Sequence, residues 1–597
     1  MLYLQIASPK SSVLNFLDSN SFEVIISIFQ RTEKVPDMER LHYFSTIGYF
    51  IIQKQVVYKM KKHILEQKQK LWYMICFMFL GLIDQRRGSA VGEIQMIFSN
   101  LTGIVVALLL LPSLELTKFR EKIYIIWLPI CIVLTTIACL LQPYLWEYKG
   151  QWNIAAFNIA VWSFLIIYMV KERKSFGFVS KIRNPFFASL FLLLFLMVLS
   201  VHEKQHTLWY FLLFGSFYLI GIPEDRRDDF REGLLNGIIA WFFIQQVIAF
   251  GFRPYDYVRY RGLYSGETQN GLFYMIVFCA FILKWIYALQ QNKKWWVRFF
   301  YFLMAAGSVS FLVYTGSRSG LLAVLAVAIV LITKYDIVLR KSFYKWLLHG
   351  VTLALCVCIT LPAVYGCIRY LPTILHHPIW FEGEYVEGKS VCSFDPWDSP
   401  KYISFEEALD DSIGRIVKAF GIKYASFART FNDIGAIKVQ AAELGEPGSS
   451  PDNIFMLDNV DPDSGDQMWA RKVIYAYYWQ HLNLQGHKTN NQGFYTVYGR
   501  YYSHAHNIFL QMACDYEIPT GILFIGIYLY SIICALRAKN QDGYMSAAFL
   551  IAILCFGLLE MVLTPGQITV VLMWIMFYFV GLDVDKSGNR TESETAE

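Results

Sequence analysis

Three short polar motifs contain charged and titratable residues that suit ligand binding and proton transfer. They are RYRGLYSGETQNG at 259–271, TGSRSG at 315–320 and SHAHN at 503–507. Arg261 and Arg318 carry permanently charged, forked guanidinium groups, and two such groups form a good clamp for a diphosphate. A neutral histidine in the third motif, His506 first and His504 second, could accept a proton from an alcohol. Together the motifs predict a site that binds a diphosphate and activates a hydroxyl.

Each of these residues also has a structural interpretation. Arginines at the ends of membrane spans often act as interfacial anchors, with the aliphatic stem in the lipid and the charge in water. Arg261 and Arg318 fit that role when each is considered alone, and His504 and His506 could be buried polar groups satisfied by neighbours. The glycines and serines around Arg318 let the backbone turn tightly and leave its guanidinium uncovered, which favours a functional group.

The composition indicates an integral membrane protein. Hydrophobic residues make up 55% of the 597 residues, charged residues make up 17%, and the mean hydropathy is +0.38, which is outside the soluble globular range. The net charge is +6, but Lys and Arg fall in short clusters between apolar runs, so they indicate membrane orientation rather than nucleic-acid binding. The 11 cysteines show no paired CxxC spacing, so they suggest neither a zinc site nor a disulfide framework. We expect no cofactor.

The apolar runs predict an all-α fold, a polytopic transmembrane bundle of about 12–14 spans with one large external loop. The run from 507 to 536 is interpreted as a single span. The predicted organisation is as follows: 1–70, a cytoplasmic extension; 71–371, the first part of the bundle; 372–503, the external loop; 504–582, the C-terminal part of the bundle; 583–597, a disordered cytoplasmic tail.

The distribution of basic residues predicts the orientation. The Lys/Arg clusters fall on alternate loops, which the positive-inside rule assigns to the cytoplasm together with both termini. The three polar motifs and the large loop are then on the outer face. Within that loop, 403–425 reads as an amphipathic helix, whereas the acidic stretch 458–466 lacks the glycine and glutamate positions of a calcium loop.

The motifs resemble a known family. An R-G-L-x-x-G segment followed by Asn, T-G-S-R-S-G at the start of a span, and a large loop that ends in H-N-x-x-L resemble the O-antigen ligase and O-antigen polymerase superfamily of bacterial membrane glycosyltransferases. The resemblance covers roughly 255–335 and 500–580 and includes Asp515 at an acidic position. The sequence departs from the family at Glu517 and Thr520, where glycines are usual, and at Gln269, where a proline is common.

The resemblance implies a mechanism and a location. Members transfer a glycan from a polyprenyl diphosphate carrier to an acceptor hydroxyl on the outer face of the cytoplasmic (inner) membrane, without a metal ion and with inversion at the sugar. Arg261 and Arg318 would hold the diphosphate and stabilise the negative charge that grows on it as the glycosidic bond breaks. We assign Arg259, Asn270 and Asn507 to the same binding set. His506 would be the base, with His504 as the second candidate.

Alternatives remain open inside and outside the superfamily. The acceptor could be a lipid or protein, as for a ligase, or another lipid-linked glycan, as for a polymerase, and the single large loop before the histidine motif favours the ligase. A lipid-linked glycan transporter or flippase should carry ionisable residues midway along its spans. Glu560 is the main candidate of that kind and lies near the end of its span. A purely structural scaffold would need no convergence of arginine and histidine on one face.

Overall fold

The computed structural model divides the chain into two compact units, Met1–Lys70 and Leu71–Glu597. The described residues are 67–84, 93–141, 152–172, 178–202, 204–252, 254–256, 260–264, 266–375, 379–386, 389–393, 454–455, 467–488, 494–496, 501–502, 504–560, 562 and 567–595. In the first unit these are the helical residues 67–70. The site lies entirely in the second unit.

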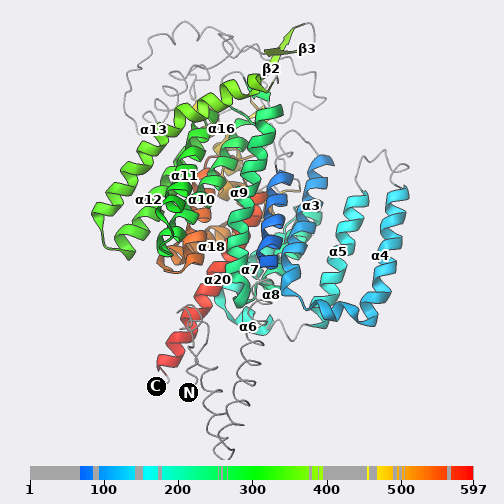
Figure 1. Cartoon of the computed structure of the whole chain (residues 1–597). Coiled ribbons are helices and arrows are strands. Elements are labelled where there is room, and N and C mark those ends of the chain that lie inside the picture. Colours follow the sequence, from blue (N-terminus) through cyan, green and yellow to red (C-terminus); the bar gives the residue numbers. More distant parts are fainter. Residues whose placement is uncertain are drawn as a thin grey trace, which may run out of the picture. The chain divides into compact units, whose positions relative to one another are not determined.

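The second unit is a helical bundle (Figure 1). Besides the helical residues 71–84, its helices are α3 (Glu93–Leu110), α4 (Lys122–Leu141), α5 (Trp152–Lys171), α6 (Phe178–Arg183), α7 (Pro185–Leu199), α8 (Lys204–Ile220), α9 (Arg227–Phe252), α10 (Glu267–Gln290), α11 (Trp295–Thr315), α12 (Arg318–Ile332), α13 (Phe343–Ile374), α16 (Gln467–Gln480), α17 (Ile508–Tyr516), α18 (Ile518–Arg537), α19 (Gln541–Gly557) and α20 (Ile568–Thr595). A π-helical segment, Thr333–Leu339, continues α12.

Small sheets interrupt this helical fold. Strands β1 (Pro254–Asp256), β2 (Ile379–Val386) and β3 (Lys389–Ser393) form one sheet, in which β1 pairs parallel and β3 antiparallel to β2. Strands β4 (Ile454–Phe455), β5 (Phe494–Thr496) and β6 (Tyr501–Tyr502) form the second. The strands of 372–503 show that this segment, expected as a loop, contains secondary structure. Its predicted helix at 403–425 and its acidic stretch at 458–466 lie outside the described residues.

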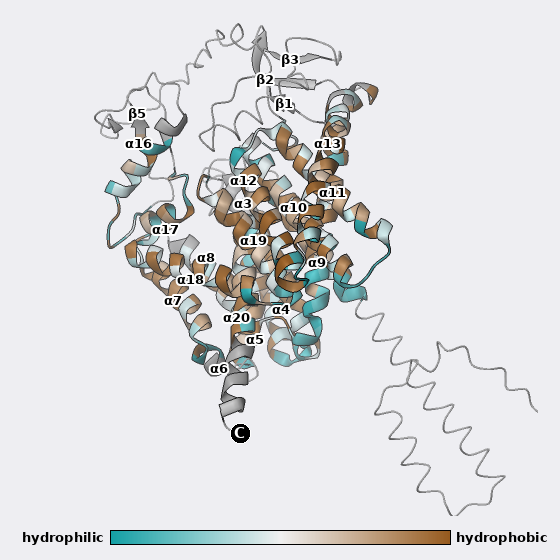
Figure 2. Ribbon diagram, turned by 90° about the vertical axis from the view of Figure 1, so that its left-hand side faces the viewer, coloured by the Kyte–Doolittle hydropathy of each residue, from teal (hydrophilic) through white to brown (hydrophobic). Residues whose placement is uncertain are grey.

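The chain is a multi-pass membrane protein by the length and composition of its helices. In the described part, eight helices are long and apolar enough to cross a membrane, namely α4, α5, α9, α10, α11, α12, α13 and α18. Five shorter apolar helices accompany them, namely α3, α7, α8, α19 and α20. Figure 2 shows hydrophobic residues along the bundle helices and hydrophilic residues gathered near the base of α9. The prediction of a helical, multi-pass membrane protein is therefore confirmed, and eight helices in the described part have the length of a full span, compared with the 12–14 spans expected.

One predicted span is wrong in the structure. The run from 507 to 536 is divided at Glu517, whose φ of 134° ends α17 after nine residues and begins α18. Pro519 at the start of α18 has no N–H to donate, so it suits the first turn of a new helix. The histidine motif consequently precedes a short helix, not a membrane span.

The predicted disordered tail also differs from the structure. Helix α20 continues through the polar residues to Thr595, although that segment has little apolar surface to bury. Extending an existing helix costs far less than nucleating one. Asp583 at the start of this extension accepts a hydrogen bond from Asn540 Nδ2 at 2.7 Å.

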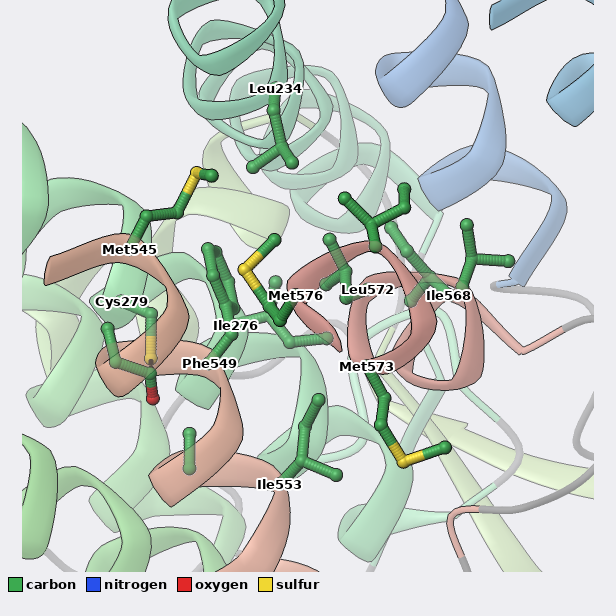
Figure 3. Close-up of a cluster of buried hydrophobic side chains, with 14 of the residues drawn as sticks. Leu234, Ile276, Cys279, Met545, Phe549, Ile553, Ile568, Leu572, Met573 and Met576 are labelled. Atoms are coloured by element: carbon green, nitrogen blue, oxygen red, sulfur yellow. Dashed lines mark hydrogen bonds between the residues drawn. The ribbon is translucent and has the colours of Figure 1, made fainter. Parts of the chain in front are cut away.

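The core surrounds α10. Every residue of its apolar stretch is buried, whereas the corresponding stretch of α4 is 11% buried. Figure 3 shows Ile276 and Cys279 of α10 beside Phe549 of α19 and Met576 of α20. Helix α10 is therefore a central helix that is hydrophobic on all sides and enclosed by its neighbours.

Helices α10 and α12 both run antiparallel to α19. The Tyr287 hydroxyl, near the end of α10, donates to the carbonyl of Gln541 at the start of α19 at 2.8 Å. Lys334 Nζ, just after α12, donates to the carbonyl of Ala535 at 2.6 Å and lies 4.4 Å from the ring centroid of Tyr544 in α19. The beginnings of α10 and α12 therefore lie at the same end of the bundle as the last residues of α19. We call this the motif end.

Candidate active site

The turn between α11 and α12 presents Arg318. Gly316 ends α11 with φ 60°, a left-handed conformation that glycine adopts at no steric cost. Ser317 caps α12 by accepting a hydrogen bond from the amide of Gly320 at 3.3 Å. Arg318 is the first residue of α12 and its side chain is exposed. The glycines and serines of TGSRSG thus form a tight turn that exposes a guanidinium at a helix N-terminus, a position that favours anions.

A second tight turn holds Arg261. The amide of Tyr264 donates to the carbonyl of Arg261 at 3.2 Å, and Gly262 has φ 61°. The base of the turn is held by Asn270, whose Nδ2 donates to the carbonyl of Tyr260 at 3.0 Å. Arg261 is half-buried. The first motif therefore folds into a turn that orients this arginine.

The two arginine turns are in direct contact. The amide of Tyr260 donates to the carbonyl of Tyr314 at 2.8 Å. Gly271 lies so close to Ser317 that a Cβ on the glycine would be 2.4 Å from the serine Cβ. A larger residue at 271 would therefore push the two turns apart. Two motifs about 50 residues apart in the sequence thus form one unit, as expected for a pair of arginines that share a ligand.

The histidine motif is a strained loop before α17. His506 has φ 48°, a conformation that costs a non-glycine residue free energy and that often marks functional sites. Two contacts hold the loop. The Tyr475 hydroxyl lies 3.3 Å from the carbonyl of His506, and the amide of Ala505 donates to Gln511 Oε1 at 2.7 Å. Tyr475 belongs to α16, so a helix of the large loop packs on the histidine motif.

His506 is part of a charged chain of three residues. Its Nδ1 lies 3.2 Å from Glu560 Oε2, and the other oxygen of Glu560 lies 3.2 Å from an Arg471 nitrogen. A carboxylate beside Nδ1 favours the tautomer with a proton on that nitrogen. The Nε2 lone pair is then available to accept a proton. The arrangement suits a general base whose imidazolium form is stabilised by Glu560.

His504 stacks on His506 with ring centroids 4.1 Å apart and planes tilted by 40°. Burial and, to a smaller extent, the charge of His506 lower the pKa of His504 to about 3. A base with such a low pKa accepts protons poorly at neutral pH. The geometry therefore favours His506 over His504 as the base.

The two asparagines of the predicted binding set have structural contacts. Asn507 Oδ1 caps α17 by accepting from the amides of Phe509 and Leu510, both at 3.0 Å, while its Nδ2 donates to the carbonyl of Leu558 at 3.3 Å. Asn270 has no exposed surface and holds the Arg261 turn. These contacts support positioning roles for both residues instead of direct contact with a diphosphate. Arg259 lies outside the described residues.

The arginine turns and the histidine loop belong to the same end of the bundle. Arg318 begins α12 and Asn270 lies in the first turn of α10, and both helices run antiparallel to α19. Glu560, the partner of His506, follows the end of α19 by three residues. The fold therefore places at the same end of the bundle three segments that are up to 245 residues apart along the chain, from Arg261 to His506.

Glu560, Arg471 and Tyr475 are the residues that sequence reasoning missed. Glu560 had been considered only as a mark of transport, although an acidic residue just beyond an apolar span is a signal that could have paired it with a histidine. Arg471 and Tyr475 lie one helical turn apart on α16, a spacing that would have placed them on one face. Among the described residues, no group of three or more His, Cys, Asp or Glu side chains could hold a metal ion.

No protein-family model and no curated protein matches this chain. What supports a function is therefore the motif resemblance and the geometry of the motif end.

Proposed function

We propose that this chain is a membrane glycosyltransferase that resembles the O-antigen ligases. It would move a glycan from a polyprenyl diphosphate carrier to an acceptor hydroxyl at the outer face of the cytoplasmic membrane, in cell-surface polysaccharide assembly. A polymerase of the same superfamily would use the same chemistry and would differ in its acceptor. The observation that carries the proposal is that two packed arginine turns and a His506–Glu560 pair lie at the same end of the bundle.

In the proposed reaction, the acceptor oxygen attacks the anomeric carbon while the bond from that carbon to the diphosphate oxygen breaks. His506 Nε2 takes the acceptor proton, and Glu560 stabilises the resulting imidazolium. The bonding electrons leave with the diphosphate, whose growing charge Arg261 and Arg318 offset. Polyprenyl diphosphate is released, and attack opposite the leaving group inverts the sugar.

The contacts at the motif end would hold the proposed catalytic groups in fixed positions. Charge stabilisation is effective when the charged groups are fixed before the reaction, because no reorganisation is then required. Hydrogen bonds of Asn270 and Ser317 fix the two arginine turns, and the contacts of Tyr475 fix the histidine loop. These groups would act as positioning residues.

The proposal is tested by transfer in proteoliposomes. The donor is a radiolabelled polyprenyl-diphosphate glycan, and the acceptors are a panel of glycolipids, lipid-linked glycans and peptides. Arg318→Ala and His506→Ala should each lower turnover by about 10²- to 10³-fold. Arg318→Lys should lose about tenfold or more, because an ammonium group cannot reproduce a bidentate fork. Arg120→Ala, at an exposed arginine away from the motif end, is the matched control and should retain activity.

The outcomes separate the alternatives. Polyprenyl diphosphate release with the glycan on a new acceptor supports a transferase, and the productive acceptor distinguishes ligase from polymerase. Full turnover in both alanine variants would refute the proposed site. Movement of intact donor across the bilayer, without transfer and dependent on an ion gradient, would identify a transporter instead.

A further inference from the structure

An apolar groove lies beside the histidine loop. Its volume is about 690 Å³, and α16, α17 and α18 supply its walls. Tyr475 and Asn507 line it where it meets the histidine loop, and Ile522 and Ile525 line it on α18. Tyr475 is the residue whose hydroxyl contacts the His506 carbonyl. The groove thus borders the loop that carries the proposed base.

The groove continues the lipid-facing surface of α18. Ile522 in the groove is 65% exposed, and Leu529 and Ile533 further along the same face of α18 are 47% and 46% exposed. Because α18 is one of the helices long enough to cross the membrane, this face meets hydrocarbon. Trp479 of α16, which is 70% exposed, lines the groove on its other side. A lining of this kind suits a hydrocarbon chain that enters from the bilayer, and does not suit a sugar or a charged peptide.

The position of the groove indicates which substrate it serves. Helix α19 packs against α10 and α12 on the one hand and against α18 on the other. The arginine turns belong to α10 and α12, whereas the groove belongs to α16, α17 and α18. In an inverting displacement the acceptor and the leaving diphosphate lie on opposite faces of the anomeric carbon. The groove is therefore on the side of the base, where the acceptor hydroxyl must be.

We infer that this groove binds the hydrocarbon chain of the acceptor, and that the acceptor is a glycolipid whose sugar hydroxyl is thereby placed at His506. The inference rests on the proposed function and specifies its acceptor. Anchoring the chain converts the encounter with the hydroxyl into a positioned, near-unimolecular step. It also excludes a water-soluble acceptor, which would gain nothing from the groove.

The first test needs no catalysis. The probe is a hexadecyl glucoside with a diazirine on its chain, added to wild-type protein in nanodiscs of phosphatidylethanolamine and phosphatidylglycerol. After irradiation, mass spectrometry should find labelled peptides from α16 and α18 that contain Trp479 or Ile522. Ile522→Trp should fill the groove and lower this labelling by about fivefold or more. Ile533→Trp, on the same face of α18 but outside the groove, is the matched control and should label as wild type does.

Three results of this test would overturn the inference. Labelling that is the same in Ile522→Trp and Ile533→Trp would mean that bulk lipid contacts the helix face without a bound chain. Competition by polyprenyl diphosphate but not by unlabelled hexadecyl glucoside would assign the groove to the donor. If no peptide from α16 or α18 is labelled, part of this chain fills the groove.

The second test measures transfer, with the productive glycolipid acceptor and its chain-free counterpart. Ile522→Trp should raise the KM for the glycolipid by about tenfold with little change in kcat, and it should leave the chain-free acceptor unaffected. Equal use of both acceptors by the wild type would refute the inference but not the proposed transferase function. Retained labelling without any transfer would refute the proposed transferase function instead.

Discussion

Replacing Glu560 by glutamine removes a charge from the proposed base pair while keeping the shape of the side chain. The carboxylate oxygen lies 3.2 Å from His506 Nδ1. During transfer His506 would become an imidazolium ion, so Glu560 would stabilise the transition state more than the ground state. An amide has no negative charge to offer, and its NH₂ group can even favour the wrong tautomer of the imidazole.

The structure sets the size of the effect. Two unit charges 3.2 Å apart attract by about 5 kcal/mol at an effective dielectric constant of 20. The side chains of His506 and Glu560 are 24% and 18% exposed, and Arg471 shares the carboxylate, so the net gain is smaller. A hydrogen bond to a charged group contributes about 1.5–3 kcal/mol. We therefore expect kcat to fall by about 10- to 150-fold in Glu560→Gln.

The assay is single-turnover transfer with saturating donor and acceptor, so that binding does not limit the rate. Glu517→Gln is a matched control, because that carboxylate accepts a hydrogen bond from Thr520 at 3.0 Å and has no described contact with the histidine loop. A Glu560→Gln rate within about threefold of wild type would contradict the pairing, since it would correspond to less than about 0.7 kcal/mol. A loss that appears in KM alone would assign Glu560 to substrate binding instead.

Two further predictions concern the same loop. Arg471→Gln should lower kcat by only about two- to fivefold, because this partly exposed guanidinium holds Glu560 without touching the base,; a loss as large as that of Glu560→Gln in the same assay would show that Arg471 contacts substrate. His504 has a pKa lowered to about 3 from 6.5, so the unfolded chain binds its proton more readily and stability falls as the pH drops from about 6.5 towards 3. Between pH 7.5 and pH 5 the loss is at most about 2 kcal/mol. The melting temperature of His504→Asn should therefore fall less than that of wild type over this interval, and an equal fall would mean that His504 is solvated.

Much of the fold could be predicted from apolar length. Among the described residues, the predicted spans between 71 and 582 are helical over most of their length, because a membrane helix must satisfy its backbone hydrogen bonds within itself. The break at Glu517 could not be predicted, since hydropathy is insensitive to a single residue in an unusual backbone conformation. The helix beyond Asp583 was missed because the polar composition shows only that this segment cannot form a core of its own. It does not show that a preceding helix can continue into the segment.

The candidate site was partly accessible from sequence. Arg261 and Arg318 were recognisable by the glycines around them, which require tight turns. The roles of Asn270 and Asn507 could not be predicted in full, because an amide that caps a helix or holds a turn looks the same in sequence as one that binds a ligand. The position of Glu560 beyond an apolar span could have marked it as a partner for a histidine, but its pairing with His506 in particular could not be predicted, because 54 residues and three helices separate them.

The enclosure of α10 has a consequence for biosynthesis. Helices α19 and α20 complete its environment, yet the ribosome makes them about 250 residues later, a delay of tens of seconds at roughly 5–20 residues per second,. Until they arrive, the buried Lys284 of α10 can pair with Glu232 of α9, but the apolar surface that Met545, Phe549 and Met576 will cover has only lipid or insertion factors as neighbours. A chain released before α19 would therefore be integrated in the membrane but unassembled, and would be a substrate for membrane quality control.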